Sequence, residues 1–291
     1  MLQRLAESLY LALQRVLPAR LLGRGVHAVA RSRNALVKTL LIRAFVRLYG
    51  VDVSEASQPV PAGYDSFNAF FTRALKPGAR PIDPDPMSLV SPADGAIQQI
   101  GRICGDEILQ VKGIGYGTDA LLGGEQAQAY RDGSFVTIYL APRNYHRVHM
   151  PAAGRIVRMT HVPGELWSVN ATTTARVPGV FARNERLVCH CEAEWGPFAV
   201  VLVGALNVGS ISTAWAGEVL PRRARVITHW DYAAGRVTLA RGASLGQFNM
   251  GSTVILLLPA GAVSWRDSLA AGVAIRTGMA LGRISGAIAQ G

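Results

Sequence analysis

The feature that most limits the fold of this chain is a series of short runs of β-forming residues that begins near Val90. Glycine, proline and asparagine separate these runs, as expected for strands joined by turns in an antiparallel sheet. The runs are residues 134–140, 155–161, 187–193, 198–205, 225–228, 236–240 and 253–258. We therefore expect an α+β protein in which N-terminal helices precede a largely antiparallel β domain.

Two stretches without a charged side chain, residues 197–217 and 242–265, approach the roughly 20 residues that a membrane-spanning helix needs. Both contain several glycines together with asparagine or glutamine, and both are rich in β-branched residues. Such residues disfavour a long apolar helix and favour strands and turns. The two stretches are therefore predicted to be buried strands.

Residues 1–50 hold most of the net charge of +11 that the 291 residues carry at pH 7. Glu7 is their single acidic residue, and their nine basic residues are Arg4, Arg15, Arg20, Arg24, Arg31, Arg33, Lys38, Arg43 and Arg47. This balance favours an anionic partner. The segment is rich in leucine and poor in the aromatic residues that stack on bases, so we expect an anionic phospholipid surface and no nucleic acid.

The same segment shows helical periodicity. The apolar positions 36, 37, 40, 41, 44, 45 and 48 share one broad side of a helix, and an earlier helix is predicted from about Leu2 to Val16, before Pro18. These helices could simply cover the core, but their concentrated positive charge favours a membrane anchor. We therefore expect a membrane-associating segment, residues 1–50, and a catalytic α+β domain, residues 51–291.

The cysteine content and the N-terminus bear on the compartment. Cys104, Cys189 and Cys191 are too few and too unevenly spaced for a disulfide framework, which predicts a reducing environment. Arg4 and Glu7 interrupt the apolar N-terminal residues, so a signal peptide is not predicted. The expected location is peripheral, on the cytoplasmic face of the cell membrane.

Three separated segments carry an acid, two histidines and a hydroxyl: Asp94, then His146 and His149, then Ser252. A serine hydroxyl becomes nucleophilic when a histidine removes its proton, and a carboxylate can hold that histidine in the required tautomer. The hydrolase pattern Gly-x-Ser-x-Gly is absent around Ser252. Gly251 leaves its own carbonyl unhindered, so the pattern fits attack of Ser252 on the preceding peptide bond.

These segments resemble the phosphatidylserine decarboxylase family, in its prokaryotic form. Residues 250–253, Met-Gly-Ser-Thr, are similar to the family's self-cleavage motif Leu-Gly-Ser-Thr. The resemblance runs from about Leu36 to at least Pro259. Its other segments are residues 67–71, 80–82, 93–95, 145–151, 162–166 and 181–186.

The resemblance implies that Asp94, His149 and Ser252 form a triad that cuts the chain between Gly251 and Ser252. The products are then a β chain, residues 1–251, and an α chain, residues 252–291. Ser252 becomes a covalent pyruvoyl cofactor, which forms a Schiff base with the amine of phosphatidylserine. The implied products are phosphatidylethanolamine and carbon dioxide. His146 is the implied proton-transfer residue, and the implied assembly is a homodimer.

Three other functions remain open from the residues themselves. A metal enzyme would use His146, His149, Cys189 and Cys191, but spacings typical of zinc sites are absent and no metal is expected. A serine hydrolase would use the same acid, histidine and serine without cutting itself. A non-catalytic lipid-binding protein would use only the basic segment.

Overall fold

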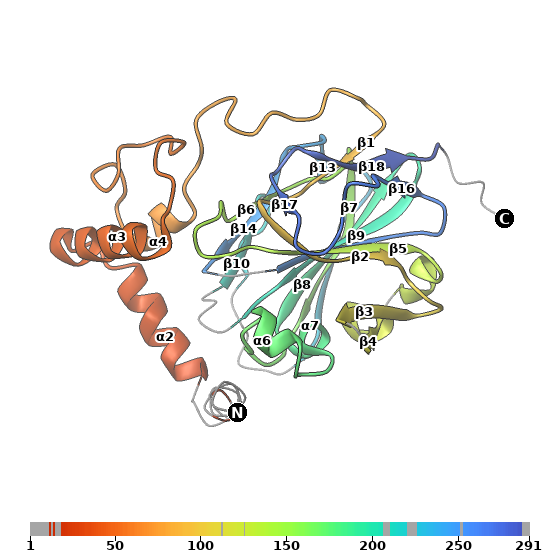
Figure 1. Cartoon of the computed structure of the whole chain (residues 1–291), viewed down its shortest axis with the longest axis horizontal. Helices are drawn as coiled ribbons and strands as arrows, with labels where there is room; N and C mark the ends of the chain where they lie inside the picture. The colour runs from red at the N-terminus through yellow and green to blue at the C-terminus, as the bar shows by residue number, and fades with distance from the viewer. Residues whose placement is uncertain are drawn as a thin grey trace.

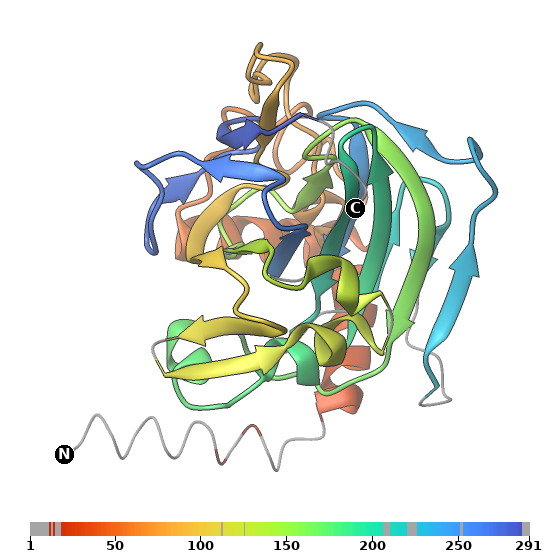
Figure 2. The same cartoon turned by 90° about the vertical axis from the view of Figure 1, so that its right-hand side faces the viewer.

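The computed structural model describes residues 12, 14, 19–111, 113–124, 126–205, 210–219, 226–250 and 253–286. Helices come first and mainly antiparallel strands follow, which confirms the predicted α+β class (Figures 1 and 2). The predicted helix from Leu2 to Val16 lies outside the described residues except at positions 12 and 14, which are helical. The described helices are α2 (Ala19–Ala30), α3 (Ala35–Tyr49), α4 (Phe67–Phe71), α5 (Thr118–Leu122), the 3₁₀ helix η1 (Ala127–Tyr130), α6 (Ala171–Thr174) and α7 (Val180–Arg183).

The strands make up most of the remaining chain. They are β1 (Ser88–Val90), β2 (Gly95–Arg102), β3 (Glu107–Val111), β4 (Ile114–Gly117), β5 (Ser134–Tyr139), β6 (Arg147–His149), β7 (Gly154–Val162), β8 (Arg186–Ala193), β9 (Gly196–Val203), β10 (Ser210–Thr213), β11 (Gly217–Val219), β12 (Thr228–Asp231), β13 (Thr238–Leu239), β14 (Ser244–Asn249), β15 (Thr253–Leu258), β16 (Val263–Trp265), β17 (Ala274–Ile275) and β18 (Ala280–Ile284).

Within the described ranges these strands form one large sheet and three smaller ones. The large sheet has nine strands in the order β12-β7-β8-β9-β15-β5-β2-β17, with β13 paired to β7. The smaller sheets have the orders β11-β10-β14-β6, β1-β18-β16 and β3-β4. All the strand pairs in these sheets are antiparallel, as the sequence predicts.

The centre of the large sheet is buried on both faces. Along β15, Val254 and Leu256 belong to one apolar cluster, whereas Ile255 and Leu257 belong to a second cluster on the other face. A strand covered on both faces needs apolar residues at successive positions rather than at alternate ones. This explains the uncharged run in the sequence. β15 therefore lies inside the core, with one apolar cluster on each face.

The predicted strands can be compared with the observed ones. Runs 134–140, 155–161, 187–193, 198–205 and 253–258 correspond to β5, β7, β8, β9 and β15, and run 236–240 contains β13. The prediction for 225–228 is wrong in position, because β12 begins only at Thr228, while residue 225 lies outside the described residues. Val226 and Ile227 are exposed, so their β-forming side chains have no core to enter.

Helices α2, α3 and α4 lie together on one side of the sheets, opposite the side on which the described part of the chain ends (Figure 1). Ile42 of α3 is fully buried and packs in a third apolar cluster with Phe67, Phe70 and Phe71 of α4. This contact fixes α3 against α4. Ile42 lies outside the apolar arc that the sequence periodicity marks on this helix.

The opposite side of α3 is apolar and exposed. Leu36, Leu40 and Leu48 recur at multiples of four residues and are 76%, 68% and 75% exposed. Arg43 and Arg47 lie beside this row and are also exposed. In the part of the chain that the structure describes, no helix combines the length and apolar character needed to cross a bilayer.

Candidate active site

The order of the strands brings the acid and serine segments to one edge of the large sheet. β2 begins directly after Asp94, and β15 begins directly after Ser252. Both strands pair with β5 between them, and Ala96 and Thr253 both lie opposite Tyr139. Two strands that share an antiparallel neighbour run in the same direction, so β2 and β15 start at the same edge.

The histidine segment follows β5 at this same edge. The chain leaves β5 after Tyr139 and enters β6, which ends at His149. The backbone N–H of His149 donates to the carbonyl of Pro92 at 2.8 Å, two residues before Asp94. The fold therefore places the acid and histidine segments side by side, although 55 residues separate them in sequence.

Gly251 and Ser252 lie outside the described residues, but the residue pairs on either side of them are described. Before them, the amide nitrogen of Asn249 donates to the hydroxyl groups of Ser210 at 3.0 Å and Ser212 at 2.8 Å. Met250 follows with a φ of 73°, a left-handed conformation that is rare for residues other than glycine. After them, Thr253 is fully buried in β15. The chain is thus anchored on both sides of the predicted cleavage point.

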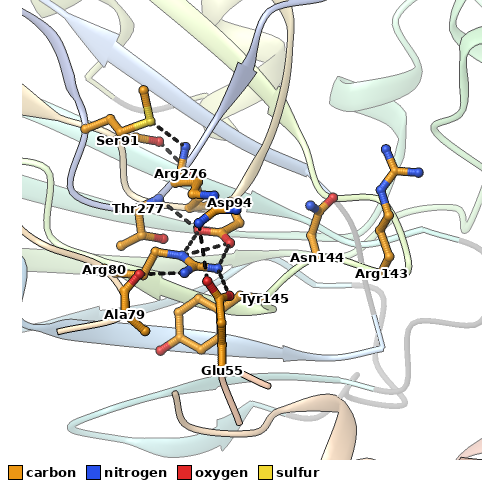
Figure 3. Close-up of polar contacts among 12 residues, drawn as sticks. Glu55, Ala79, Arg80, Ser91, Asp94, Arg143, Asn144, Tyr145, Arg276 and Thr277 are labelled. Atoms are coloured by element: carbon orange, nitrogen blue, oxygen red, sulfur yellow. Dashed lines mark hydrogen bonds and ion pairs between the residues drawn. The ribbon is translucent and has the colours of Figure 1, made fainter. Parts of the chain in front are cut away.

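Asp94 is buried and held mainly by one arginine (Figure 3). The Nε of Arg80 donates to the two carboxylate oxygens at 2.9 and 3.0 Å, and its Nη2 donates to Oδ2 at 2.6 Å. The backbone N–H of Thr277 adds a hydrogen bond to Oδ1 at 2.9 Å. These donors hold the carboxylate in one orientation.

Arg80 also donates to Glu55 at 2.9 Å, so one guanidinium joins two carboxylates. Burial lowers the pKa of Arg80, but its hydrogen bonds with Asp94 and Glu55 outweigh burial and raise the pKa above its usual value. The arginine therefore stays charged, and the cluster keeps the Asp94 side chain in one orientation.

The ring of His149 has a defined tautomer. Its Nδ1 lies 2.8 Å from the carbonyl oxygen of Gly242, which can only accept, so Nδ1 carries the proton. Its Nε2 lies 3.0 Å from the hydroxyl of Tyr145 and accepts from it. Burial, opposed by the hydrogen bond to Gly242, lowers the pKa of His149. His149 is therefore a neutral base whose lone pair is on Nε2.

Asp94 and His149 lie at the same edge without a hydrogen bond between their side chains. The sequence suggests that a carboxylate holds the histidine tautomer, but among the described residues the Gly242 carbonyl does so. Asp94 acts on His149 through its charge, which favours the protonated ring.

His146 occupies a different environment from His149. Its ring is buried and stacked on Phe71, with the ring centroids 4.0 Å apart, and its Nε2 donates to the carbonyl of Pro142 at 3.2 Å. The segment is extended into β6, and residues three apart on a strand point to opposite sides. The two histidines therefore do not share a face.

A cavity of about 420 Å³ lies beside Asp94. Charged, polar and apolar residues line it, mainly from the loop after α3, the start of β2, the residues after β5 and the segment before β18. The lining residues are Gly50, Asp52, Glu55, Arg73, Arg80, Asp94, Gly95, Ala96, Tyr139, Ala141, Arg143, Asn144, Tyr145, Ala274, Ile275, Arg276 and Met279.

Several residues of the site were not identified from the sequence as functional. Arg80 and Tyr145 lie in segments that carry the family resemblance, and that was the signal available for them. Glu55 and Gly242 lie outside every such segment. Their roles depend on contacts with residues that are distant in sequence, so only the fold reveals them.

The cysteines considered as metal ligands lie in the core. Cys189 and Cys191 are buried in β8, and burial raises the pKa of both thiols, that of Cys189 to about 12. The described residues contain no group of three or more histidine, cysteine or acidic side chains placed to hold a metal ion.

Comparison with known proteins gives a consistent result. Residues 67–283 match the family model described as phosphatidylserine decarboxylase, and residues 9–50 match a second one described as PSD. A phosphatidylserine decarboxylase proenzyme of Methylococcus capsulatus is 49% identical over 276 residues, 94% of this chain and 96% of the relative. Proteins of the same description from Verminephrobacter eiseniae and Azotobacter vinelandii are 52% and 50% identical, over 92% and 96% of this chain and 95% and 99% of their own lengths.

Proposed function

The chain belongs to the phosphatidylserine decarboxylase family, and from this premise we propose that it cuts itself between Gly251 and Ser252 and uses Ser252 as the source of its pyruvoyl group. The protein is a proenzyme of a pyruvoyl-dependent decarboxylase that converts phosphatidylserine to phosphatidylethanolamine and carbon dioxide. The observation that carries the proposal is that β2 and β15 begin at the same edge of the large sheet, directly after Asp94 and Ser252, and that His149 of β6 is hydrogen-bonded there to Pro92.

In this proposal His149 is the base for self-cleavage. Its Nδ1 is already protonated, so Nε2 is the nitrogen that can take the proton of the Ser252 hydroxyl. Tyr145 occupies the single lone pair of this nitrogen at 3.0 Å, so its hydroxyl must turn away before Nε2 accepts the serine proton. Burial favours the neutral ring, which is the form that a base requires.

The cleavage itself requires no group from outside the chain except water. The Ser252 oxygen attacks the Gly251 carbonyl carbon, the peptide C–N bond breaks, and an ester replaces it. Loss of the α-proton of residue 252 then eliminates the Gly251 carboxylate and leaves dehydroalanine. Addition of water to the dehydroalanine releases ammonia and leaves the pyruvoyl group at the start of the second chain.

The site suits a pyruvoyl group, because the strand that would carry it begins at the buried Thr253, with the cavity beside its neighbour Tyr139. When formed, the group supplies an electron sink for the carbanion that loss of carbon dioxide leaves, which ordinary side chains cannot do. We assign the return of a proton to the substrate carbon to His146. This assignment rests on the family resemblance, because the His146 ring is buried against Phe71 and is not among the residues that line the cavity.

We also propose that the protein is peripheral to the cytoplasmic face of the cell membrane and attaches through its N-terminal segment. The exposed leucine row of α3 and the arginines beside it support this attachment to an anionic lipid surface. The homodimer and the division at residue 50 remain predictions.

The test of the proposed function is the denatured mass of the purified wild-type protein compared with a Ser252→Ala variant. We expect two fragments from the wild type, split after Gly251, with the second fragment blocked at its start as a pyruvoyl group. The variant is expected to remain a single chain, because alanine has no nucleophilic oxygen.

The matched control is Ser264→Ala, which removes an exposed hydroxyl from the same C-terminal fragment. This variant should cleave like the wild type. An uncut wild-type chain that retains a serine at position 252 would contradict the proposal and would favour the hydrolase or lipid-binding alternatives.

A further inference from the structure

Two buried arginines in this protein differ in whether their guanidinium N–H groups have hydrogen-bond acceptors. Arg73 is 3% exposed and Arg186 is 2% exposed, and burial lowers the pKa of both, that of Arg186 to about 10. Placing a guanidinium in the interior is costly unless its N–H groups find acceptors. The two side chains therefore provide a comparison within one molecule.

Arg186 is satisfied by the backbone. Its Nε donates to Leu121 at 2.6 Å, and its Nη1 donates to Ala182 at 2.6 Å and to Asn184 at 2.9 Å. Its Nη2 donates to the carbonyl of Ala120. All three of its nitrogens thus have acceptors, as expected for a structural arginine.

Arg73 is not satisfied in this way. Its Nη2 makes a long hydrogen bond, 3.5 Å, to the carbonyl of Arg143, and its guanidinium lies 5.2 Å from the centre of the Phe70 ring. The Nε and Nη1 have no hydrogen-bond partner among the described residues. A buried donor without an acceptor is unfavourable, so this arginine is suited to an anion that is not part of the described chain.

The cavity beside Asp94 is the space available to such an anion, because Arg73 lines it. Arg80 in the same wall already forms ion pairs with Asp94 and Glu55. Arg276 pairs with Glu55 at 3.3 Å. Figure 3 shows the Arg143 side chain directed away from the Asp94 cluster. Arg73 is therefore the buried cation of the cavity whose N–H groups are available to bind an anion. The volume of about 420 Å³ accommodates a small polar headgroup.

The cavity also reaches the membrane-facing part of the protein. Gly50 and Asp52, which directly follow α3, are among its lining residues. Gly50 ends the helix whose Leu48 is exposed. A lipid held in a bilayer against α3 would thus have its headgroup near the cavity.

We propose that this cavity binds the phosphodiester of a phospholipid headgroup and that Arg73 is the residue that holds it. The inference rests on the proposed function for the identity of the lipid. The phosphodiester is favoured over the substrate carboxylate because its charge is unchanged by the reaction. A guanidinium on the carboxylate would stabilise the ground state more than the transition state, in which that charge is leaving.

The test uses the full chain with Ser252→Ala, so that binding is measured without self-cleavage. Titration calorimetry compares glycerophosphoserine, glycerophosphoethanolamine, free serine and inorganic phosphate. We expect both glycerophospho compounds to bind, and Arg73→Gln to weaken both by at least about tenfold, since charged hydrogen bonds are lost. Arg73→Lys keeps the charge but lacks the planar guanidinium, so it should weaken binding by an intermediate factor. It replaces the glutamine variant in the test if that variant does not fold.

The matched control is Arg102→Gln, an exposed arginine outside the cavity, which removes the same charge and should leave binding unchanged. Unaltered binding by both Arg73 variants would overturn the inference. Dependence on Arg73 for the serine-containing ligands alone would instead assign a carboxylate site, and inorganic phosphate binding as tightly as the diesters would assign a free-phosphate site. Both results would contradict the proposal.

In the processed enzyme, Arg73→Lys should raise the KM for phosphatidylserine while the extent of self-cleavage stays at the wild-type level. This separates the two proposals. A wild-type chain that does not cleave would refute the cleavage proposal and leave the calorimetric result standing. A chain that cleaves, with unchanged KM in the Arg73 variant, would refute the headgroup site alone.

Discussion

Asp94 receives four hydrogen bonds, three from the side chain of Arg80 and one from the backbone of Thr277. The ring of His149 is oriented by two other groups, the Gly242 carbonyl and the Tyr145 hydroxyl. The acid and the base are therefore positioned independently. Asp94 influences the base through the electric field, which acts over a longer range than a hydrogen bond.

At this scale we predict that Arg80→Lys, in the Ser252→Ala background, lowers the free energy of unfolding by about 1.5–3 kcal/mol, because lysine cannot span both Asp94 and Glu55. In the cleavable chain the same change should slow self-cleavage. The measurements are denaturant unfolding and the rate of fragment appearance.

The matched control for that prediction is Arg283→Lys. Arg283 pairs with Asp85 at 3.1 Å, but their side chains are 70% and 40% exposed, so the expected loss is below about 1 kcal/mol. Equal stability losses in the two variants would show that the Arg80 cluster is an ordinary surface ion pair.

Among the elements, α3 combines two opposite surfaces on 15 residues. One surface contributes Ile42 to the aromatic cluster with α4, and the other exposes the leucine row. The packed surface gives the helix a fixed position, so the exposed surface is presented in one direction. A helix held in this way can lie in a membrane interface without leaving the protein.

For this element we predict that replacing Leu36, Leu40 and Leu48 together by glutamine weakens binding to vesicles containing phosphatidylserine by at least about tenfold, because each buried leucine contributes about 1.5–3 kcal/mol. Co-sedimentation with vesicles measures the effect. Leu109→Gln, on the exposed side of β3, is the control and should bind like the wild type. Full binding by the triple variant would exclude this face as the anchor.

Over the whole molecule, the proposed cleavage point separates strands that are paired with one another. β15 of the C-terminal part lies between β5 and β9, β17 pairs with β2, and β18 pairs with β1. The two products therefore share one sheet and one core. Cutting one peptide bond at the edge of that sheet removes none of these contacts.

We accordingly predict that the fragments 1–251 and 252–291 elute together in size-exclusion chromatography in native buffer and separate only in denaturant. The eluted mass also tests the expected homodimer. Uncut Ser252→Ala protein is the control for elution position. Separation of the fragments in native buffer would mean that the strand pairing of β15 does not survive cleavage.

The α+β class, the main strands and the family could all be predicted from the sequence, because they depend on local residue types and short motifs. The sequence also selected Asp94, His149 and Ser252, since acid, histidine and serine segments are visible in isolation. Three features became visible only in the folded chain: the pairing of Arg80 with Asp94, the hydrogen bond of His149 to the Gly242 carbonyl, and the exposure of the leucine row. Each depends on which distant segment packs against a side chain, and helical periodicity cannot say which of two apolar sides is covered.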